Sequence, residues 1–385
     1  MNKVKLGDVV TRVKDFVDKD NTDLIYYVGG EHFDEKSLTV RRRGTIKGST
    51  IGPAFSTRFK PGDVLLMSRN PHLRKAGMVD FEGICSDVSY IIRTKDENIL
   101  MQKFIPLLFQ SDAFWKFAEK NKKGSTNFFL NWSDFERFEF DLPDHETQDK
   151  LCNTLWAVND TLDSYYEMLD NTDHLIAAKF VEMFGQIGED PYSFGMKTLD
   201  ECTIINPRKP KDIDDDTLVS FVAMPSVSEK GDIDASILKP YKDVKKGFTY
   251  FQNGDVLFAK ITPCMENGKG CVATALSNNI GMGSTEFHVL RPIKNVSNPY
   301  WIYVLTKFDS FRINARKNMT GTGGQLRVPA SYLKEFKIAL PPINLQNEFE
   351  LFYKNALKSK NALKDGINRV TSLFKKIMTQ YIKED

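Results

Sequence analysis

Two stretches of the chain carry a regular stripe of apolar residues. In residues 144–184, which contain no glycine or proline, apolar side chains recur at alternating spacings of three and four, and a second stripe occupies residues 344–382. This seven-residue period predicts two long amphipathic helices. The residues expected on the two seams are Leu151, Leu155, Val158, Leu162, Leu169 and Ile176 in the first helix and Phe349, Phe352, Leu363, Val370 and Ile377 in the second.

The segment before each stripe has a different pattern. Short apolar runs such as residues 64–67 and 88–92 are separated by Gly, Pro, Asn and Asp, which predicts strands joined by turns. A helix is expected over residues 105–119, between those strands and a Gly-Ser-Thr turn at 124–126. Each segment is therefore expected to be a mixed α/β (α+β) globular unit.

The two halves of the chain repeat each other in the same order. Gly62-Asp63-Val64-Leu65 recurs as Gly254-Asp255-Val256-Leu257, Lys120-Asn121-x-x-Gly124-Ser125 as Lys317-Asn318-x-x-Gly321-Thr322, and Leu142-Pro143 with Gln148 as Leu340-Pro341 with Gln346. This repetition indicates an internal duplication. The expected domains are globular units at 1–143 and 186–341 and long helices at 144–185 and 342–385.

Charge suggests how the helices are partnered. Residues 144–185 hold two basic and nine acidic side chains, a net charge of −7, whereas residues 342–385 hold eight basic and five acidic ones, a net charge of +3. Opposite charges beside two apolar seams favour pairing of the helices with each other. We expect an antiparallel coiled coil with pseudo-twofold symmetry that separates the two globular units; the alternative is that each helix packs only on its own unit.

The globular units are mildly basic, although the whole chain of 385 residues has a net charge of only +2. Within each unit the basic residues are clustered, and one cluster lies beside the repeated Lys-Asn-x-x-Gly-Ser/Thr sequence. Glycine lets the backbone approach a phosphate closely, lysine and hydroxyl groups bind phosphate oxygens, and arginine can read the edge of guanine, so these clusters are suited to binding DNA. The alternative is a solvated surface. The candidate DNA-binding residues of the first unit are Arg41, Arg42, Arg43, Arg69, Arg74, Lys75, Lys120, Lys122, Lys123, Ser125 and Thr126. Those of the second unit are Lys245, Lys246, Lys260, Arg312, Arg316, Lys317, Thr322 and Gln325.

Motifs of catalysis are weak or missing. The five cysteines form no Cys-x-x-Cys pair, the five histidines are scattered, and no Gly-x-x-x-x-Gly-Lys-Ser/Thr loop occurs. Asn298-Pro299-Tyr300 is only a partial match to a methyltransferase loop, and Glu335-x-Lys337 only a partial match to a nuclease motif. We expect no catalytic, cofactor or metal site. Without a signal peptide or a long apolar run, a soluble cytoplasmic protein with no membrane partner is expected.

The repeated junctions resemble those of the specificity (S) subunits of type I restriction-modification systems. Leu142-Pro143 with Gln148, and Leu340-Pro341-Pro342 with Gln346, are similar to the family's Leu-Pro-Pro-x-x-Glu-Gln sequence, and the Gly124-Ser125-Thr126 turn is similar to another family feature. Asp144 replaces the second proline in the first copy, and both copies lack the glutamate.

The resemblance implies a non-catalytic DNA-recognition subunit. Each globular unit would be a target recognition domain that reads one half of a bipartite site in double-stranded DNA, and the coiled coil would set the gap. Two modification subunits would bring S-adenosylmethionine for adenine methylation, and restriction subunits would use ATP and magnesium, so no cofactor belongs to this chain. The alternatives are a single-chain nuclease or methyltransferase with a cryptic site, and a coiled-coil scaffold that does not bind DNA.

Overall fold

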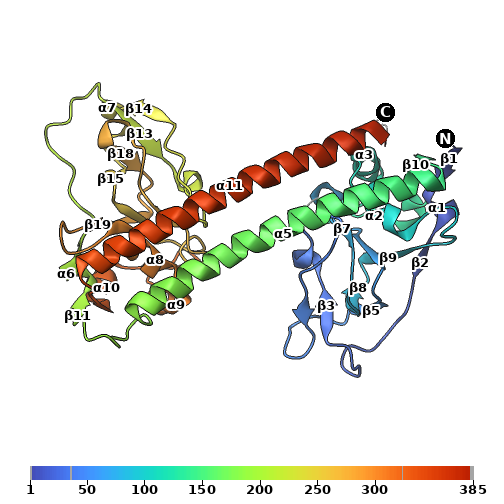
Figure 1. The fold of residues 1–385 in the computed structure, drawn as a ribbon, viewed down its shortest axis with the longest axis horizontal. Coiled ribbons are helices and arrows are strands. Elements are labelled where there is room, and N and C mark those ends of the chain that lie inside the picture. Colours follow the sequence, from blue (N-terminus) through green and yellow to red (C-terminus); the bar gives the residue numbers. More distant parts are fainter. Residues whose placement is uncertain (1, 35–36, 323, 382–385) are drawn as a thin grey trace. The chain divides into compact units, whose positions relative to one another are not determined.

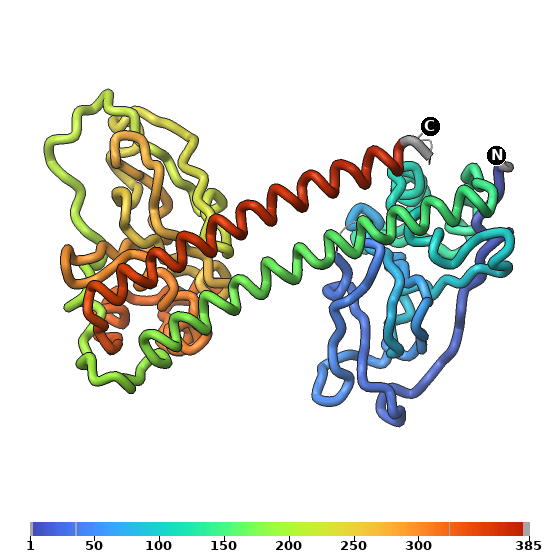
Figure 2. Tube along the Cα trace, viewed as in Figure 1, coloured from blue at the N-terminus to red at the C-terminus, as the bar shows by residue number. Residues whose placement is uncertain are grey.

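The computed structural model describes residues 2–34, 37–322 and 324–381, and the chain forms two compact units (Figure 1). The first unit comprises Met1–Glu167 and Leu363–Asp385, and the second comprises Met168–Ala362. Both are mixed α/β units. The long helices α5 (His145–Phe184) and α11 (Ile343–Tyr381) each contribute to both units and run without a break (Figure 2).

Within the residues that the structure describes, each unit contains two four-stranded sheets and one two-stranded ribbon with the same topology. In the first unit the strand orders are β2-β9-β6-β7, β4-β3-β8-β5 and β1-β10, and in the second they are β12-β19-β16-β17, β14-β13-β18-β15 and β11-β20. The pairs β3–β8 and β13–β18 are parallel, and the other pairs are antiparallel. The internal duplication expected from the sequence is thus present in the fold.

The strand bounds follow the same order in the two units. The first unit contains β1 (Asn2–Lys5), β2 (Val10–Val13), β3 (Tyr26–Val28), β4 (Gly44–Thr45), β5 (Phe55–Phe59), β6 (Val64–Met67), β7 (Ala76–Met78), β8 (Gly83–Ser86), β9 (Ser89–Thr94) and β10 (Glu139–Leu142). The second unit contains β11 (Met196–Thr198), β12 (Thr203–Ile205), β13 (Leu218–Val222), β14 (Leu238–Pro240), β15 (Thr249–Phe251), β16 (Val256–Ala259), β17 (Gly270–Val272), β18 (Gly281–Gly283), β19 (Phe287–Pro292) and β20 (Lys337–Ala339).

Short helices accompany the sheets. The first unit has α1 (Leu6–Val9), α2 (Ile105–Leu108), α3 (Asp112–Asn121) and α4 (Trp132–Phe135), and the second has α6 (Leu199–Cys202), α7 (Tyr241–Val244), α8 (Pro299–Lys307), α9 (Asp309–Lys317) and α10 (Ala330–Glu335). The single helix expected over residues 105–119 is divided into α2 and α3. The division occurs because the Ser111 hydroxyl accepts the backbone N–H of Phe114 and starts a new helix there.

The repeated Gly-Asp-Val-Leu sequence has a structural cause. Asp63 and Asp255 are almost fully buried at the start of β6 and β16. Asp255 accepts the backbone N–H of Gln252 at 2.8 Å and pairs with the Arg291 guanidinium of β19 at 2.7 Å. Asp63 pairs in the same way with Arg93 of β9. Each aspartate therefore closes a turn and ties two central strands together, which satisfies its buried charge.

The long helices pack against each other within each unit. In the first unit the core contains Leu151 and Leu155 from the beginning of α5 together with Met378 from the end of α11. In the second unit Phe180, near the end of α5, meets Phe349, near the beginning of α11, with ring centroids 5.4 Å apart. The two helices are therefore antiparallel.

The predicted seams differ in burial along the helices. Leu151, Leu155, Leu169, Ile176 and Phe349 are buried, whereas Val158, Leu162, Phe352, Leu363, Val370 and Ile377 are partly exposed.

Polar residues also lie on the buried stripe, where an apolar pattern could not reveal them. The Asn159 side chain accepts the Leu38 N–H at 3.4 Å, and Lys360, whose side chain is 7% exposed, forms an ion pair with Asp173. Among the helices of the described residues, none is long and apolar enough to span a bilayer.

Candidate nucleic-acid interface

A tight hairpin loop at residues 123–129 presents the first group of candidate residues. Lys123 and Phe129 exchange two backbone hydrogen bonds of 2.8 and 3.0 Å. Gly124 has a φ of +94°, and a Cβ there would lie 2.6 Å from the Asn127 carbonyl oxygen, so the turn requires glycine. Residues 123–127 are exposed, which leaves the hydroxyls of the Ser125-Thr126 pair facing solvent.

This loop is attached to the segment that follows β6. The Asn70 N–H donates to the Phe128 carbonyl at 2.9 Å, and the Leu130 N–H donates to the Ser68 carbonyl at 2.9 Å. Arg69 forms a β-bridge with Phe129. Two segments more than fifty residues apart in the sequence therefore make one surface, on which Arg69 and the 123–129 loop lie together.

The second unit builds the same pair of loops from a different sequence. Thr320 and Arg327 exchange two backbone hydrogen bonds of 2.9 and 2.8 Å, and a Cβ on Gly321, whose φ is +133°, would lie 2.7 Å from the Gln325 carbonyl oxygen. The Thr262 N–H donates to the Leu326 carbonyl at 3.0 Å, which joins this loop to the segment after β16.

The loop of the second unit is also held by an ion pair. The Arg327 guanidinium donates to both carboxylate oxygens of Glu286 at 2.9 Å, and this bond lowers the pKa of Glu286.

Some of the candidate cations are engaged within the protein. Ion pairs join Arg41 to Asp163, Arg42 to Asp34, Arg74 to Asp112, Lys122 to Glu119, Lys245 to Asp215, Arg312 to Asp309 and Arg316 to Glu266. The Lys75 ammonium donates to the Gly30 carbonyl, and the Arg43 guanidinium lies over the rings of Tyr26 and Phe81.

Other candidate cations remain available. Six of them make no ion pair with any residue in the described ranges: Arg69, Lys120, Lys123, Lys246, Lys260 and Lys317. Ser125, Thr126, Thr322 and Gln325 are exposed. In each unit the available groups therefore include members of the paired loops, Arg69 and Lys123 in the first and Lys260, Thr322 and Gln325 in the second.

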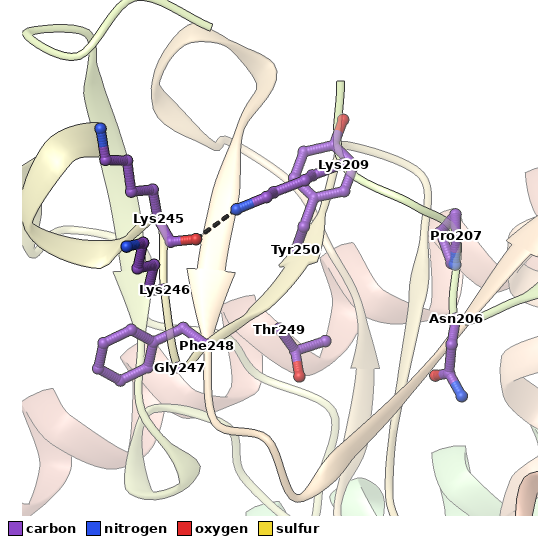
Figure 3. Close-up of a pocket in the computed structure, with 9 residues that line it drawn as sticks. All are labelled: Asn206, Pro207, Lys209, Lys245, Lys246, Gly247, Phe248, Thr249 and Tyr250. Atoms are coloured by element: carbon purple, nitrogen blue, oxygen red, sulfur yellow. Dashed lines mark hydrogen bonds between the residues drawn. The ribbon is translucent and has the colours of Figure 1, made fainter. Parts of the chain in front are cut away.

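Lys245 and Lys246 border a cavity of 460 Å³ beside β15 of the second unit (Figure 3). Figure 3 shows the Lys209 ammonium directed at the backbone carbonyl of Lys245, to which it donates a hydrogen bond. Phe248 is exposed at the edge of the cavity. Lys209 is not among the residues predicted from the sequence, although it lies in a basic run, Arg208-Lys209-Pro210-Lys211, that could have indicated it.

Burial shifts the pKa values of His288, Cys85 and Cys202. His288 is buried, its Nε2 lies 2.8 Å from the Val328 carbonyl oxygen, and burial lowers its pKa. Burial raises the pKa of the Cys85 thiol to about 12 and that of Cys202 to about 11, so both are protonated and poorly nucleophilic near neutral pH. No group of three or more His, Cys, Asp or Glu side chains that could hold a metal occurs among residues 2–34, 37–322 and 324–381.

The Asn298-Pro299-Tyr300 sequence also has a structural role. The Asn298 side chain accepts the Tyr300 N–H at 2.9 Å and caps the first turn of α8. Its amide nitrogen donates to Asn347 at 2.9 Å on α11. This asparagine therefore connects the cap of α8 to the long helix that follows.

Comparisons with known proteins agree with this architecture. Residues 195–370 match the family model described as the type I restriction modification DNA specificity domain. The type I restriction enzyme EcoAI specificity subunit of Escherichia coli is 40% identical over 159 residues, which are 41% of this chain and 27% of that protein. The match thus spans about a quarter of that relative's length.

Solved structures extend the likeness of the fold to the whole chain. The S subunit of the type I restriction-modification system from M. genitalium has a TM-score of 0.52 at 12% identity, with 100% of this chain and 96% of that chain covered. A chain from a study of complex assembly and conformational transition of the type I R-M system has a TM-score of 0.51 at 17% identity, with 98% and 96% covered.

The matched segment lies mostly in the second unit, and the first unit repeats the sheet topology of that unit. Residues 195–370 are thus similar to the DNA specificity domain of type I restriction-modification systems, and the whole chain has a fold similar to that of a type I S subunit.

Proposed function

We propose that this chain is the DNA-specificity subunit of a type I restriction-modification complex and that each unit reads one half of a bipartite target. The observation that carries this proposal is the repetition of one exposed loop pair. The loop closed by Lys123 and Phe129 and the loop closed by Thr320 and Arg327 share the same pair of backbone hydrogen bonds, a glycine requirement at the position after the first closing residue, and the same attachment to the segment after an equivalent strand. A twofold-repeated reader is suited to a target with two parts.

Within each loop pair, different side chains serve different contacts. Arg69 and Lys123 have no ion-pair partner among the described residues, so their charge is available to phosphates, as are the hydroxyls of Ser125 and Thr126. Such contacts hold a protein on DNA without reading its sequence. Exposed side chains that can bond to base edges, such as Gln325, supply sequence discrimination.

The long helices act as the spacer in this proposal. Target recognition domains at residues 1–143 and 186–341 are joined by spacer helices at 144–185 and 342–385. Two readers on a stiff connection bind both half-sites only when the gap in the DNA suits that connection. The bases are then chosen by the globular units, and the gap is chosen by α5 and α11.

The catalytic steps belong to partner subunits. Two modification subunits would bring S-adenosylmethionine and methylate an adenine in each half-site, and restriction subunits would supply the ATP- and magnesium-dependent steps in the cytoplasm. A relative of the same fold comes from a study of complex assembly in a type I R-M system, which supports this assignment. Our proposal gives this chain no bond-making or bond-breaking step.

The decisive experiment compares the methylated sequences of cells that contain the complete system with those of cells that lack only this chain. We expect a two-part methylated motif that disappears with the chain. Binding of the purified chain to a duplex carrying that motif should be lost when either half is scrambled and should weaken steeply with salt. Cleavage or methylation of DNA by the chain alone would instead establish an enzyme. Failure to bind the duplex that carries the motif, as well as the scrambled ones, would support a scaffold that does not bind DNA.

A further inference from the structure

Two completely buried glutamines occupy equivalent places in the duplicated fold. Gln148 lies in the first turn of α5 and Gln346 in the first turn of α11, and neither exposes any surface. A buried amide must have its hydrogen-bonding groups satisfied, because an unpaired polar group in the interior is costly. Their partners therefore show what the two side chains hold.

Gln148 joins three parts of the first unit. Its Oε1 accepts the backbone N–H of Met101 at 2.9 Å, and its Nε2 donates to the carbonyl oxygens of Ile99 and Pro143, each at 2.9 Å. Ile99 and Met101 belong to the connection between β9 and α2, and Pro143 is the junction residue before α5. One planar amide thus connects the globular part to the beginning of the long helix.

Gln346 makes the equivalent bonds in the second unit. Its Oε1 accepts the Asn298 N–H at 2.8 Å, and its Nε2 donates to the carbonyl oxygens of Val296 at 3.0 Å and Pro341 at 2.7 Å. Val296 and Asn298 belong to the connection between β19 and α8, and Pro341 is the junction residue before α11. The same three bonds therefore occur twice, although the residues around them differ.

These bonds restrict direction as well as position. The acceptor and the two donated hydrogens of a glutamine lie in one plane, so three partners on two segments fix how that plane is turned. Glutamate could still accept the Met101 N–H but could not donate, and methionine, of similar length, could make none of the bonds.

We propose that Gln148 and Gln346 are positioning residues that set the direction in which each long helix leaves its globular unit and thereby the permitted gap between the half-sites. This inference rests on the proposed function, in which α5 and α11 form the spacer. It predicts that loosening either junction broadens the range of accepted gaps and leaves the recognised bases unchanged.

The first unit offers a matched control. Gln102 accepts the Thr94 N–H at 2.7 Å and donates to the carbonyl oxygens of Gly62 at 2.9 Å and Ile92 at 3.1 Å. It therefore makes the same kinds of bonds as Gln148, but none of these partners lies on a long helix or at a junction. Gln102→Met removes three hydrogen bonds of the same kinds and should leave the permitted gap unchanged.

The experiment uses the complete system in cells that have no other copy. Methylated motifs are sequenced for the wild-type chain and for Gln148→Met, Gln148→Glu, Gln346→Met, Gln346→Glu and Gln102→Met. Only variants that show cooperative thermal unfolding are compared. Among them, we expect methylation at gaps one base pair longer or shorter to rise about tenfold, relative to methylation at the main gap, in the Gln148 and Gln346 variants but not in Gln102→Met.

Several results would overturn the inference. A two-part motif whose gap is equally strict in the folded Gln148 and Gln346 variants would reject the positioning role and leave the proposed function intact. An equal broadening by Gln102→Met, or a change in the recognised bases, would also reject it. A wild-type chain without a two-part motif would reject both proposals.

A second measurement does not depend on the variants' folding. Hydrogen exchange of the wild-type chain should show the Met101 and Asn298 amides protected at least tenfold more strongly than exposed loop amides. Fast exchange at both amides would mean that the clamps do not persist and would overturn the inference.

Discussion

At the scale of single residues, the structure separates cations that are available from those that are engaged. Lys122 is bonded to Glu119 at 2.7 Å and lies over the Phe128 ring, whereas Lys123 and Arg69 have no ion pair within the described residues. Lys123→Ala and Arg69→Ala should each weaken binding to all DNA sequences and reduce the salt slope by about one. Lys122→Ala should do less. Fluorescence anisotropy at several salt concentrations measures this, and equal losses for Lys122 and Lys123 would contradict it.

A second prediction concerns the backbone of the loop. Gly124→Ala places a methyl group 2.6 Å from the Asn127 carbonyl oxygen at a φ of +94°, so the hairpin must distort. DNA affinity should fall. Gly48→Ala is the control, because Gly48 also has a positive φ, +81°, but a Cβ there meets nothing within 4 Å. The strain of a left-handed residue, about 1–2 kcal/mol, is then common to both variants. The same loss of affinity in both would show that loop shape is unimportant.

A third residue makes stability depend on pH. Burial, with the neighbouring Arg312 as the second cause, lowers the pKa of Lys307 to about 8 from an ordinary value of 10.5. Between pH 8 and 10.5 the Lys307 side chain binds more protons in the unfolded chain than in the folded chain. The free energy of unfolding therefore increases as pH rises, by at most about 1.4 kcal/mol per pH unit. Urea unfolding of the wild-type chain and of Lys307→Met should show this increase only in the wild type. A difference between the two chains that stays constant with pH would refute it.

At the scale of elements, the buried stripe of α5 determines how firmly the long helices hold together. Leu155 is fully buried in the core of the first unit with Leu151 and Met378, whereas Leu175 on the same helix is 55% exposed. Leu155→Ala should lower the free energy of unfolding by about 3 kcal/mol because it leaves a cavity. Leu175→Ala should change it by less than about 0.5 kcal/mol. Denaturant unfolding tests both, and similar effects would mean that the seam is not a packed core.

The long helices and the duplication could be predicted because their signals are local or repeated. A seven-residue period needs no knowledge of distant residues, and the recurring Gly-Asp-Val-Leu sequence marks turns that are closed by Asp63 and Asp255. The parallel pairing of β3 with β8 was not predictable, because it joins segments that are distant in sequence through short strands.

Electrostatic partners were hidden for the same reason. Lys122 and Lys123 are adjacent and chemically identical, and only the fold shows that Glu119 occupies the first of them. The seam was predicted from apolar residues alone, so Asn159 and Lys360 were missed, although both are buried. Their burial is possible because Asn159 bonds to the Leu38 backbone and Lys360 to Asp173. Sequence periodicity reports apolar positions and says little about polar groups satisfied by distant partners.

At the scale of the whole molecule, the proposed spacer role of α5 and α11 predicts that the permitted gap changes with the length of the two helices. Inserting one heptad into both α5 and α11 keeps every seam position in phase, because seven residues complete nearly two turns. It lengthens the paired rod by about 10 Å, the rise of about three base pairs of DNA. The methylated motif should then keep its half-site bases and change its permitted gap. Inserting a heptad into α5 alone is the control, because it shifts the acidic helix against its basic partner and should abolish methylation. Changed half-site bases in the double insertion would show that the helices take part in reading sequence, and an unchanged gap would show that they do not measure distance.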